Sequence, residues 1–214
     1  MRYGVLGTGA VGHSIASKLV ELGHQVTMGS RQAGNQAAVE WARGAGEGAA
    51  EGSFADAAET GEALFNCTAG TASLAALESA GAEHLSGKVL IDVANPLDFS
   101  EGPPPTLSVC NDDSLAEQIQ RAFPNVRVVK ALNTVNAEVM TNPAAVPGDH
   151  DIFVAGDDAQ AKAEVRSLLE AFGWRTILDL GDITAARGLE MYLPLWLRLW
   201  QSTGTAQLNV HVAR

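Results

Sequence analysis

The chain has 214 residues, enough to bury a large core in one domain or in a large and a small one. Apolar residues make up 46% of it, which excludes an intrinsically disordered chain. A formal net charge of −11 at pH 7 argues against nucleic acid or an anionic membrane as a partner.

A glycine-rich turn stands near the start of the chain. The apolar run Tyr3–Leu6 predicts a strand, and Val11–Leu22 has the pattern of a helix. The spacing between them is that of a dinucleotide-binding turn, in which the first glycine permits a tight turn, the second lets the backbone approach a pyrophosphate, and the third lets the helix pack on the strand. We therefore expect a nucleotide to bind at Gly7, Thr8, Gly9, Ala10, Val11 and Gly12.

The end of the second predicted strand, Gln25–Met28, indicates which nucleotide binds. A site selective for NAD would place Asp or Glu there to accept hydrogen bonds from the ribose 2′-hydroxyl. This chain has Gly29-Ser30-Arg31, and the next carboxylate in the sequence is Glu40. A hydroxyl donor and an arginine fork suit a 2′-phosphate. We predict NADP(H), with its 2′-phosphate on Ser30 and Arg31 and Thr8 close by; the alternative is that Arg31 is a solvated residue before a helix.

Strands and helices alternate along the following residues without an internal repeat. The expected helices are Asn35–Arg43, Ser73–Ala80 and one that starts at Asp113–Glu117 and ends at Pro124, and the expected strands are Glu62–Cys67, Lys88–Val93 and Val126–Lys130. This alternation predicts an α/β fold with a Rossmann-type, doubly wound parallel sheet.

The last third of the chain is organised differently. It contains a strand at Asp151–Ala155, a helix at Ala159–Phe172 that Gly173 ends, and a strand at Arg175–Asp179. We expect an NADP-binding domain at residues 1–134 and a small C-terminal α/β domain for substrate binding or dimerisation at 135–214.

Leu189–Trp200 is the most apolar segment of the chain. About a dozen residues cannot span a bilayer, so no membrane partner is expected. A helix that is apolar on most faces is usually buried, which favours the interface of a homodimer. The alternative is a monomer in which this helix covers the core.

Polar residues follow the ends of several predicted strands. Ligands of such sheets bind at the carboxyl ends of the strands, near the point where the strand order reverses. The small residues Ala69 and Gly70 would let the backbone approach a nicotinamide ring, and polar side chains there could bind its ribose or carboxamide. The candidates are Thr68, Ala69, Asn95, Asn133 and Thr134. Each polar side chain could equally cap its own loop.

The two cysteines, Cys67 and Cys110, lie far apart and form no Cys-x-x-Cys motif. With no signal-peptide pattern, they favour a reduced, cytoplasmic protein. The five histidines show no metal-ligand spacing, and we expect no structural metal.

Taken together, these segments resemble the NADPH-dependent F420 reductase family, the F420H2:NADP+ oxidoreductases. The likeness runs through Met1–Gly12, Leu22–Val26 and Gly29–Arg31, and continues at Val129–Thr134, Val154–Asp158 and Leu178–Gly181 with Arg187, Glu190 and Pro194. The resemblance implies a dimeric Rossmann protein in which NADPH exchanges hydride with a deazaflavin. It places the 2′-phosphate on Thr8, Ser30 and Arg31, and the nicotinamide near Ala137.

One residue departs from the family pattern. The deazaflavin enzymes carry a histidine in an Ala-Leu-His-Thr segment, where this chain has Asn133. Relatives of the Rossmann part also include the cytoplasmic portion of membrane ferric reductases, which suggests flavin as another partner. The small-molecule redox acceptor is therefore coenzyme F420, a flavin, or a small carbonyl or imine compound.

Hydride transfer between two cofactors requires no catalytic acid, base or nucleophile, and we assign none. A carbonyl reductase would need a proton donor, for which Lys130 and Tyr192 are the candidates. Leu193 and Trp196 could help to exclude water from the reacting rings, although a structural role in the core is the simpler interpretation. A protein that senses NADPH without turnover is a further alternative.

Overall fold

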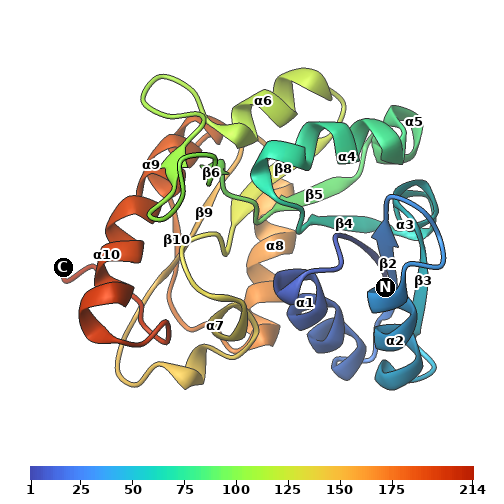
Figure 1. Ribbon diagram of the computed structural model, residues 1–214, viewed down its shortest axis with the longest axis horizontal. Helices are drawn as coiled ribbons and strands as arrows, with labels where there is room; N and C mark the ends of the chain where they lie inside the picture. The colour runs from blue at the N-terminus through green and yellow to red at the C-terminus, as the bar shows by residue number, and fades with distance from the viewer.

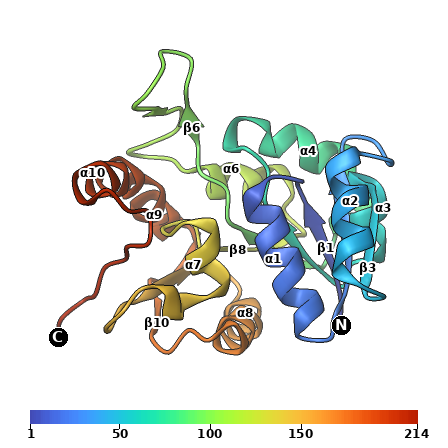
Figure 2. The same ribbon diagram turned by 60° about the horizontal axis from the view of Figure 1, so that its bottom comes forward.

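The computed structural model describes residues 1–214 and contains one large sheet with helices on both faces (Figures 1 and 2). The strand order is β10-β9-β8-β5-β4-β1-β2-β3. All neighbours are parallel except β8 and β9, which are antiparallel. The strands are β1 (Arg2–Leu6), β2 (Gln25–Ser30), β3 (Ala49–Ser53), β4 (Ala63–Asn66), β5 (Val89–Asp92), β8 (Arg127–Ala131), β9 (Ile152–Ala155) and β10 (Ile177–Asp179). The predicted doubly wound, Rossmann-type fold is confirmed.

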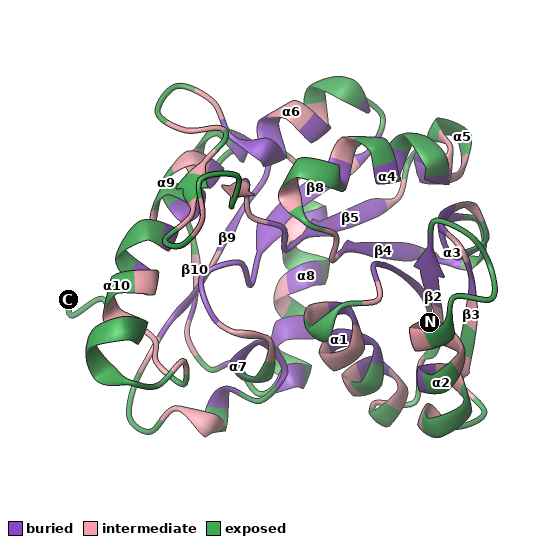
Figure 3. Ribbon diagram, viewed as in Figure 1, coloured by how far each residue is buried: buried purple, intermediate pink, exposed green.

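Each face of the sheet carries its own apolar core, because successive side chains of a strand point to opposite faces. In β5, Val89 and Ile91 belong to one core and Leu90 to the other. The first core is covered by α1 (Ala10–Glu21), α2 (Gln36–Ala45), α7 (Ala137–Thr141) and α8 (Ala159–Phe172). The second is covered by α3 (Phe54–Thr60), α4 (Ser73–Ala80), α5 (Ala82–Leu85) and α6 (Leu115–Ala122). The central strands are therefore buried on both sides (Figure 3).

Several short elements were not expected from the sequence. Strand β3 reads Ala-Ala-Glu-Gly-Ser, which lacks the β-branched and aromatic residues that favour strands. It nevertheless pairs with β2 at the edge of the sheet. Helix α3 does have a local signal, since Ser53 and Asp56 form a capping box. A hairpin of two two-residue strands, β6 (Leu97–Asp98) and β7 (Thr106–Leu107), projects from the molecule in Figure 2.

The C-terminal strands do not form a sheet of their own. β9 and β10 extend the main sheet beyond β8, so residues 135–214 share a core with the first half of the chain. The domain boundary expected at residue 134 stays a prediction.

The apolar segment Leu189–Trp200 is divided between two helices, α9 (Ala186–Met191) and α10 (Leu193–Thr203), with Pro194 in the first turn of α10. Helix α10 buries Leu193 and Trp196 and leaves Leu195 and Trp200 55% and 44% exposed. The homodimer expected from this segment stays a prediction. No helix has both the length and the apolar run needed to cross a bilayer.

The three glycines of the turn between β1 and α1 have distinct steric roles. Gly7 has a φ of +123°, and a Cβ atom there would lie 2.6 Å from the carbonyl oxygen of Cys67. A Cβ atom on Gly12 would lie 2.1 Å from the carbonyl oxygen of Gly7, whereas one on Gly9 would meet nothing within 4 Å. Gly7 and Gly12 are thus required by the fold, and Gly9 faces open space.

This difference predicts that two alanine substitutions lower the free energy of unfolding by different amounts. Gly12→Ala forces the backbone of α1 away from Gly7, and overpacking of this kind costs about 1–3 kcal/mol. Gly9→Ala meets open space, so its cost should be limited to the weaker N-cap preference of alanine, below about 1 kcal/mol. Urea unfolding of both variants is the measurement; equal losses would contradict this assignment.

Candidate functional site

The site lies where the strand order reverses. The chain runs outward from β1 through β2 to β3, and then outward from β4 through β5 to β8 on the other side. The loops that leave β1 and β4 therefore separate at the carboxyl edge of the sheet, which is where open α/β sheets bind ligands. Two adjoining cavities open there.

The first cavity, which we call the nucleotide groove, has a volume of about 970 Å³. It is lined by 17 residues, of which Arg31 is the only charged one. Seven of the predicted site residues line it: Gly7, Thr8, Gly9, Ser30, Arg31, Thr68 and Ala69. Further lining that the sequence did not indicate comes from α3 and α4 and from the residue before α4: Phe54, Ala72, Ala75, Ala76 and Ser79.

Helix α1 points its N-terminus at the groove. Gly9 is the N-cap residue and offers no side chain to the amides of the first turn, which also contains no acidic residue. The free amides and the positive end of the helix dipole favour an anion. Of the predicted residues in this turn, Ala10 is the first residue of α1, and Gly12 packs on Gly7.

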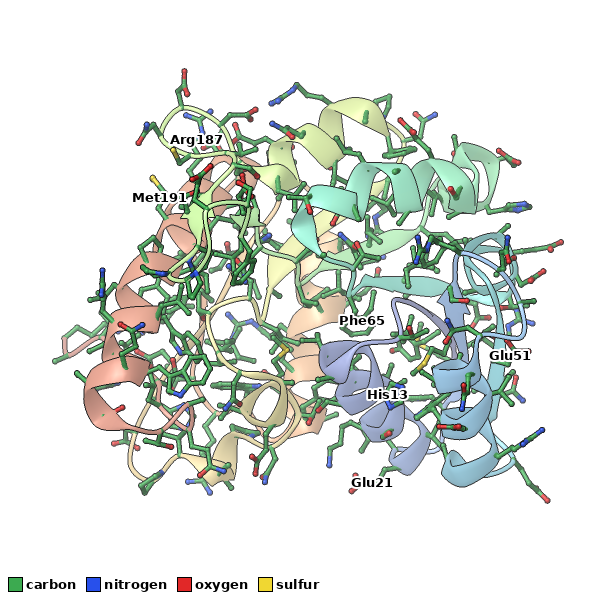
Figure 4. All side chains as sticks on the ribbon, in the orientation of Figure 1. His13, Glu21, Glu51, Phe65, Arg187 and Met191 are labelled. Carbon is green, nitrogen blue, oxygen red and sulfur yellow. The ribbon has the colours of Figure 1, made fainter.

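The loop after β2 is held in shape before any ligand binds. The Ser30 hydroxyl donates a hydrogen bond to the carbonyl of Gln32 at 2.6 Å, and the Gly34 amide donates one to Glu51 at 2.9 Å. Asn35 caps α2 by accepting from the Ala38 amide. Glu51, labelled in Figure 4, comes from the unexpected strand β3, so a carboxylate that is distant in sequence holds this loop.

The second cavity, which we call the apolar pocket, has a volume of about 480 Å³ and is lined by 19 residues. It contains the predicted residues Val11, Asn95, Asn133 and Ala137. Cys67, Thr68 and Ala69 line both cavities, so the two adjoin along this strip. Asp98 is the only charged residue of the pocket.

Burial and the Asp92 carboxylate raise the pKa of the Cys67 thiol well above its usual range, so this thiol stays protonated. Asp98 accepts a hydrogen bond from the Ser100 amide, which lowers the pKa of its carboxyl. Neither side chain is a proton donor near neutral pH.

The Asn95 and Asn133 side chains bind each other. The Asn95 amide donates to the carbonyl of Asn133 at 2.9 Å, and the Asn133 amide donates to the Asn95 side-chain oxygen at 2.9 Å and to the carbonyl of Leu189 at 3.0 Å. Leu132, directly before, has a φ of +62°, a costly conformation for leucine. Thr134 is buried, and its hydroxyl has no hydrogen-bond partner. The asparagines thus join the ends of β5 and β8 to α9.

Gly70 has a packing role that the sequence did not indicate. A Cβ atom at this position would lie 2.1 Å from the carbonyl oxygen of Asn95. The absence of a side chain therefore allows the loop after β4 to pack on the backbone after β5, and it would be required even without a ligand.

A buried polar network lies beneath the shared strip. The Thr68 hydroxyl donates to the Asn66 side-chain oxygen at 2.7 Å, and the Asn66 amide donates to Asp92 at 2.8 Å. Asp92 is in turn paired with the Lys130 ammonium at 2.8 Å. The position of Thr68 is therefore tied to the ends of β4, β5 and β8.

Lys130 is not available as a proton donor to a substrate, which corrects the role considered for it. Its side chain is fully buried and pairs with Asp92 and with Glu190 of α9, the latter at 2.7 Å. Glu190 also accepts the amides of Leu115 and Ala116 at the start of α6. Tyr192, the other candidate, does not line the apolar pocket, and its buried hydroxyl has no hydrogen-bond partner. Both residues are parts of the fold.

A second ion pair attaches α9 to α6. Arg187, labelled in Figure 4, binds Glu117 through two nitrogens, and this guanidinium lowers the pKa of the Glu117 carboxyl. Leu193 and Trp196, which follow on α10, line the apolar pocket. Trp196 is thus both a core residue and a wall of the site.

Comparison with known proteins gives concordant matches. The family model described as "NADP oxidoreductase coenzyme F420-dependent" matches residues 2–96. The F420-dependent NADP reductase of Methanothermobacter marburgensis is 31% identical over 210 residues, covering 93% of this chain and 92% of that protein. A crystal structure of a candidate F420-dependent NADP reductase from Arthrobacter sp. FB24 is 50% identical, with a TM-score of 0.95 and coverage of 100% and 99%.

More distant matches share the fold. Rat metalloreductase STEAP3 is 29% identical over 199 residues, which cover 91% of this chain but only 38% of that longer protein. An imine reductase from Bacillus cereus aligns with a TM-score of 0.64 at 18% identity, over 94% of this chain and 61% of its own. At 18% identity, the likeness to the imine reductase concerns the architecture alone.

The buried cluster predicts a large effect for Lys130→Met. Removing the ammonium leaves two carboxylates buried without a cation, a change that costs about 3–5 kcal/mol of unfolding free energy. The control is Arg2→Met, which breaks the exposed Arg2–Glu62 pair and should cost less than about 1 kcal/mol. Chemical denaturation measures both, and similar small losses would show that Lys130 does not hold the site together.

Proposed function

This chain belongs to the F420-dependent NADP reductase family and is an NADP-dependent oxidoreductase; we propose that it transfers hydride between NADP(H) and a deazaflavin, coenzyme F420. The proposal rests on one observation: the nucleotide groove shares three lining residues with an apolar pocket that contains no proton donor. The NADP(H) cofactor supplies or receives the hydride, and the protein aligns the two rings and excludes water.

In this proposal the nucleotide groove takes the adenosine and pyrophosphate part of NADP(H). The pyrophosphate lies against the first turn of α1, where Gly9 leaves space and no side chain competes for the amides. The 2′-phosphate lies against Arg31, the only charged side chain of the groove. Because the Ser30 hydroxyl already donates to Gln32, its first role is to shape the loop that presents Arg31.

The nicotinamide then lies along Cys67, Thr68 and Ala69, the strip that the two cavities share. The polar network through Asn66 and Asp92 fixes Thr68 there. Ala137 and Val11 border the apolar pocket, so small and apolar side chains surround the place where the acceptor ring meets the nicotinamide.

The absence of a proton donor from the apolar pocket indicates the class of the electron acceptor. Reduction of a carbonyl or imine needs a proton at the reacting group. The pocket holds no Lys, Tyr, His or Glu, and Lys130 is paired with two carboxylates elsewhere. A deazaflavin accepts hydride at carbon and takes its proton at a distant nitrogen that solvent can reach. Asn133, which replaces the family histidine, is bound to Asn95 and so contributes to the wall of the pocket.

Replacing Arg31 tests the placement of the 2′-phosphate. Loss of a charge-assisted hydrogen bond costs about 1.5–3 kcal/mol, so Arg31→Ala should raise the Kd of NADPH about 10- to 100-fold and leave that of NADH within about twofold. Arg43→Ala, on the exposed end of α2 outside the groove, changes the net charge equally and is the control. Equal losses for the two nucleotides would place the 2′-phosphate elsewhere.

The acceptor is tested by anaerobic oxidation of NADPH with coenzyme F420, FMN, FAD and a cyclic imine offered in parallel. We expect rapid reduction of F420, and slower turnover when NADH replaces NADPH. Reduction of a flavin alone would change the acceptor, and reduction of the imine would contradict the proton-donor argument. Binding of NADPH without any turnover would favour a sensor instead.

A further inference from the structure

Phe99 is a large apolar side chain that the fold leaves in solvent. It is 60% exposed, although it lines the apolar pocket. It directly follows β6 in the hairpin between β5 and α6, which projects beside α10 and α4 (Figure 2). Nothing in its sequence neighbourhood, a proline-rich loop, indicated a role in the site.

The root of this hairpin is attached to the floor of the site. The Leu97 amide donates to the carbonyl of Asn95 at 2.8 Å, and the Ser108 amide donates to the carbonyl of Pro96 at 2.8 Å. Leu97 also pairs with Leu107 across the two strands. Since Asn95 is bound to Asn133, the hairpin starts from a fixed point at the ends of β5 and β8.

The backbone around Phe99 is also defined. Asp98 accepts a hydrogen bond from the Ser100 amide at 2.8 Å, and the carbonyl of Phe99 accepts one from Gly102 at 2.9 Å. These bonds form a turn that presents the phenyl ring. On the far side of the hairpin, the Asn111 amide lies 3.4 Å from the sulfur of Met191, which Figure 4 labels on α9. The ring is therefore positioned without being packed in the core.

The apolar pocket is also lined by Leu193 and Trp196 of α10, and Trp196 is only 7% exposed. The hairpin and α10 thus supply apolar lining from different parts of the chain. The pocket adjoins the nucleotide groove at Cys67, Thr68 and Ala69, which line both cavities. An occupant of the pocket that reaches this strip is therefore in the same cavity as the Phe99 side chain.

We propose that Phe99 contacts the planar ring system of the electron acceptor and selects tricyclic aromatic acceptors over smaller compounds. A flat ring that enters the pocket covers the exposed phenyl group, which gains both burial and aromatic contact. This inference rests on the proposed function and adds to it a residue that determines acceptor specificity. Phe99 binds and orients the ring and takes no part in the chemistry.

Exposure of Phe99 makes the test direct, because the side chain contributes little to the core. In Phe99→Ala, the Kd of oxidised F420 measured by its fluorescence in the presence of NADP+ should rise about tenfold, equivalent to about 1.4 kcal/mol. The KM for F420 should rise in parallel, while the Kd of NADPH and the melting temperature stay unchanged. Phe99→Tyr, which keeps the ring, should remain within about twofold of the wild type.

Leu180→Ala is the matched control, since Leu180 is 44% exposed and lies outside the apolar pocket. It should change none of these quantities. If the wild type binds F420 and the Phe99→Ala variant binds it with the same Kd, this inference is overturned and the proposed function stands. If the wild type bound FMN instead of F420, the proposed acceptor would be wrong. The Kd of FMN for the same variants would then decide the role of Phe99. A wild type that binds neither ring would overturn both.

Discussion

The geometry of the site depends on the two ion pairs of the Lys130 ammonium. This ammonium is buried between the carboxylates of Asp92 and Glu190, in a place where an unpaired charge of either sign would be expensive. Asp92 accepts a hydrogen bond from Asn66, which in turn accepts one from Thr68. Glu190 accepts hydrogen bonds from the first amides of α6. One cation therefore connects the ends of β4, β5 and β8, and Thr68 of the shared strip, to α9 and α6.

The sheet and the C-terminal helices α9 and α10 contribute different parts of the site. The sheet edge and α1 provide a site for a phosphate-containing ligand that needs little besides glycines, free amides and Arg31. Helix α10 provides apolar lining of the pocket, and α9, which precedes it, is attached to α6 by Arg187 and Glu190. In the proposed hydride transfer the chain supplies no acid or base, and its contribution is to position the two rings and to exclude water.

The parts of the site that the sequence predicted are those built from consecutive residues. Gly7, Gly12 and Arg31 could be assigned because a turn between a strand and a helix imposes its requirements within a few positions. The burial of Lys130, a candidate donor only for a carbonyl reductase, could not be foreseen, since its partner Glu190 is 60 residues away and nothing near either residue shows the pair. Glu51 and Phe99 were missed for the same reason, as β3 is weakly apolar and the hairpin strands have two residues each. The contact of Gly70 with Asn95 was missed as well, because the two loops that meet there follow different strands.

The two cavities share only the strip Cys67–Ala69 and reach the surface at different residues, the exposed Arg31 for one and the exposed Phe99 for the other. Neither ligand has to pass through the other's cavity to enter or leave. In the proposed reaction, both substrates can therefore be bound at once and in either order. Net hydride flow then follows the ratios of the reduced and oxidised pairs relative to the equilibrium constant, so that the same site can form or consume NADPH.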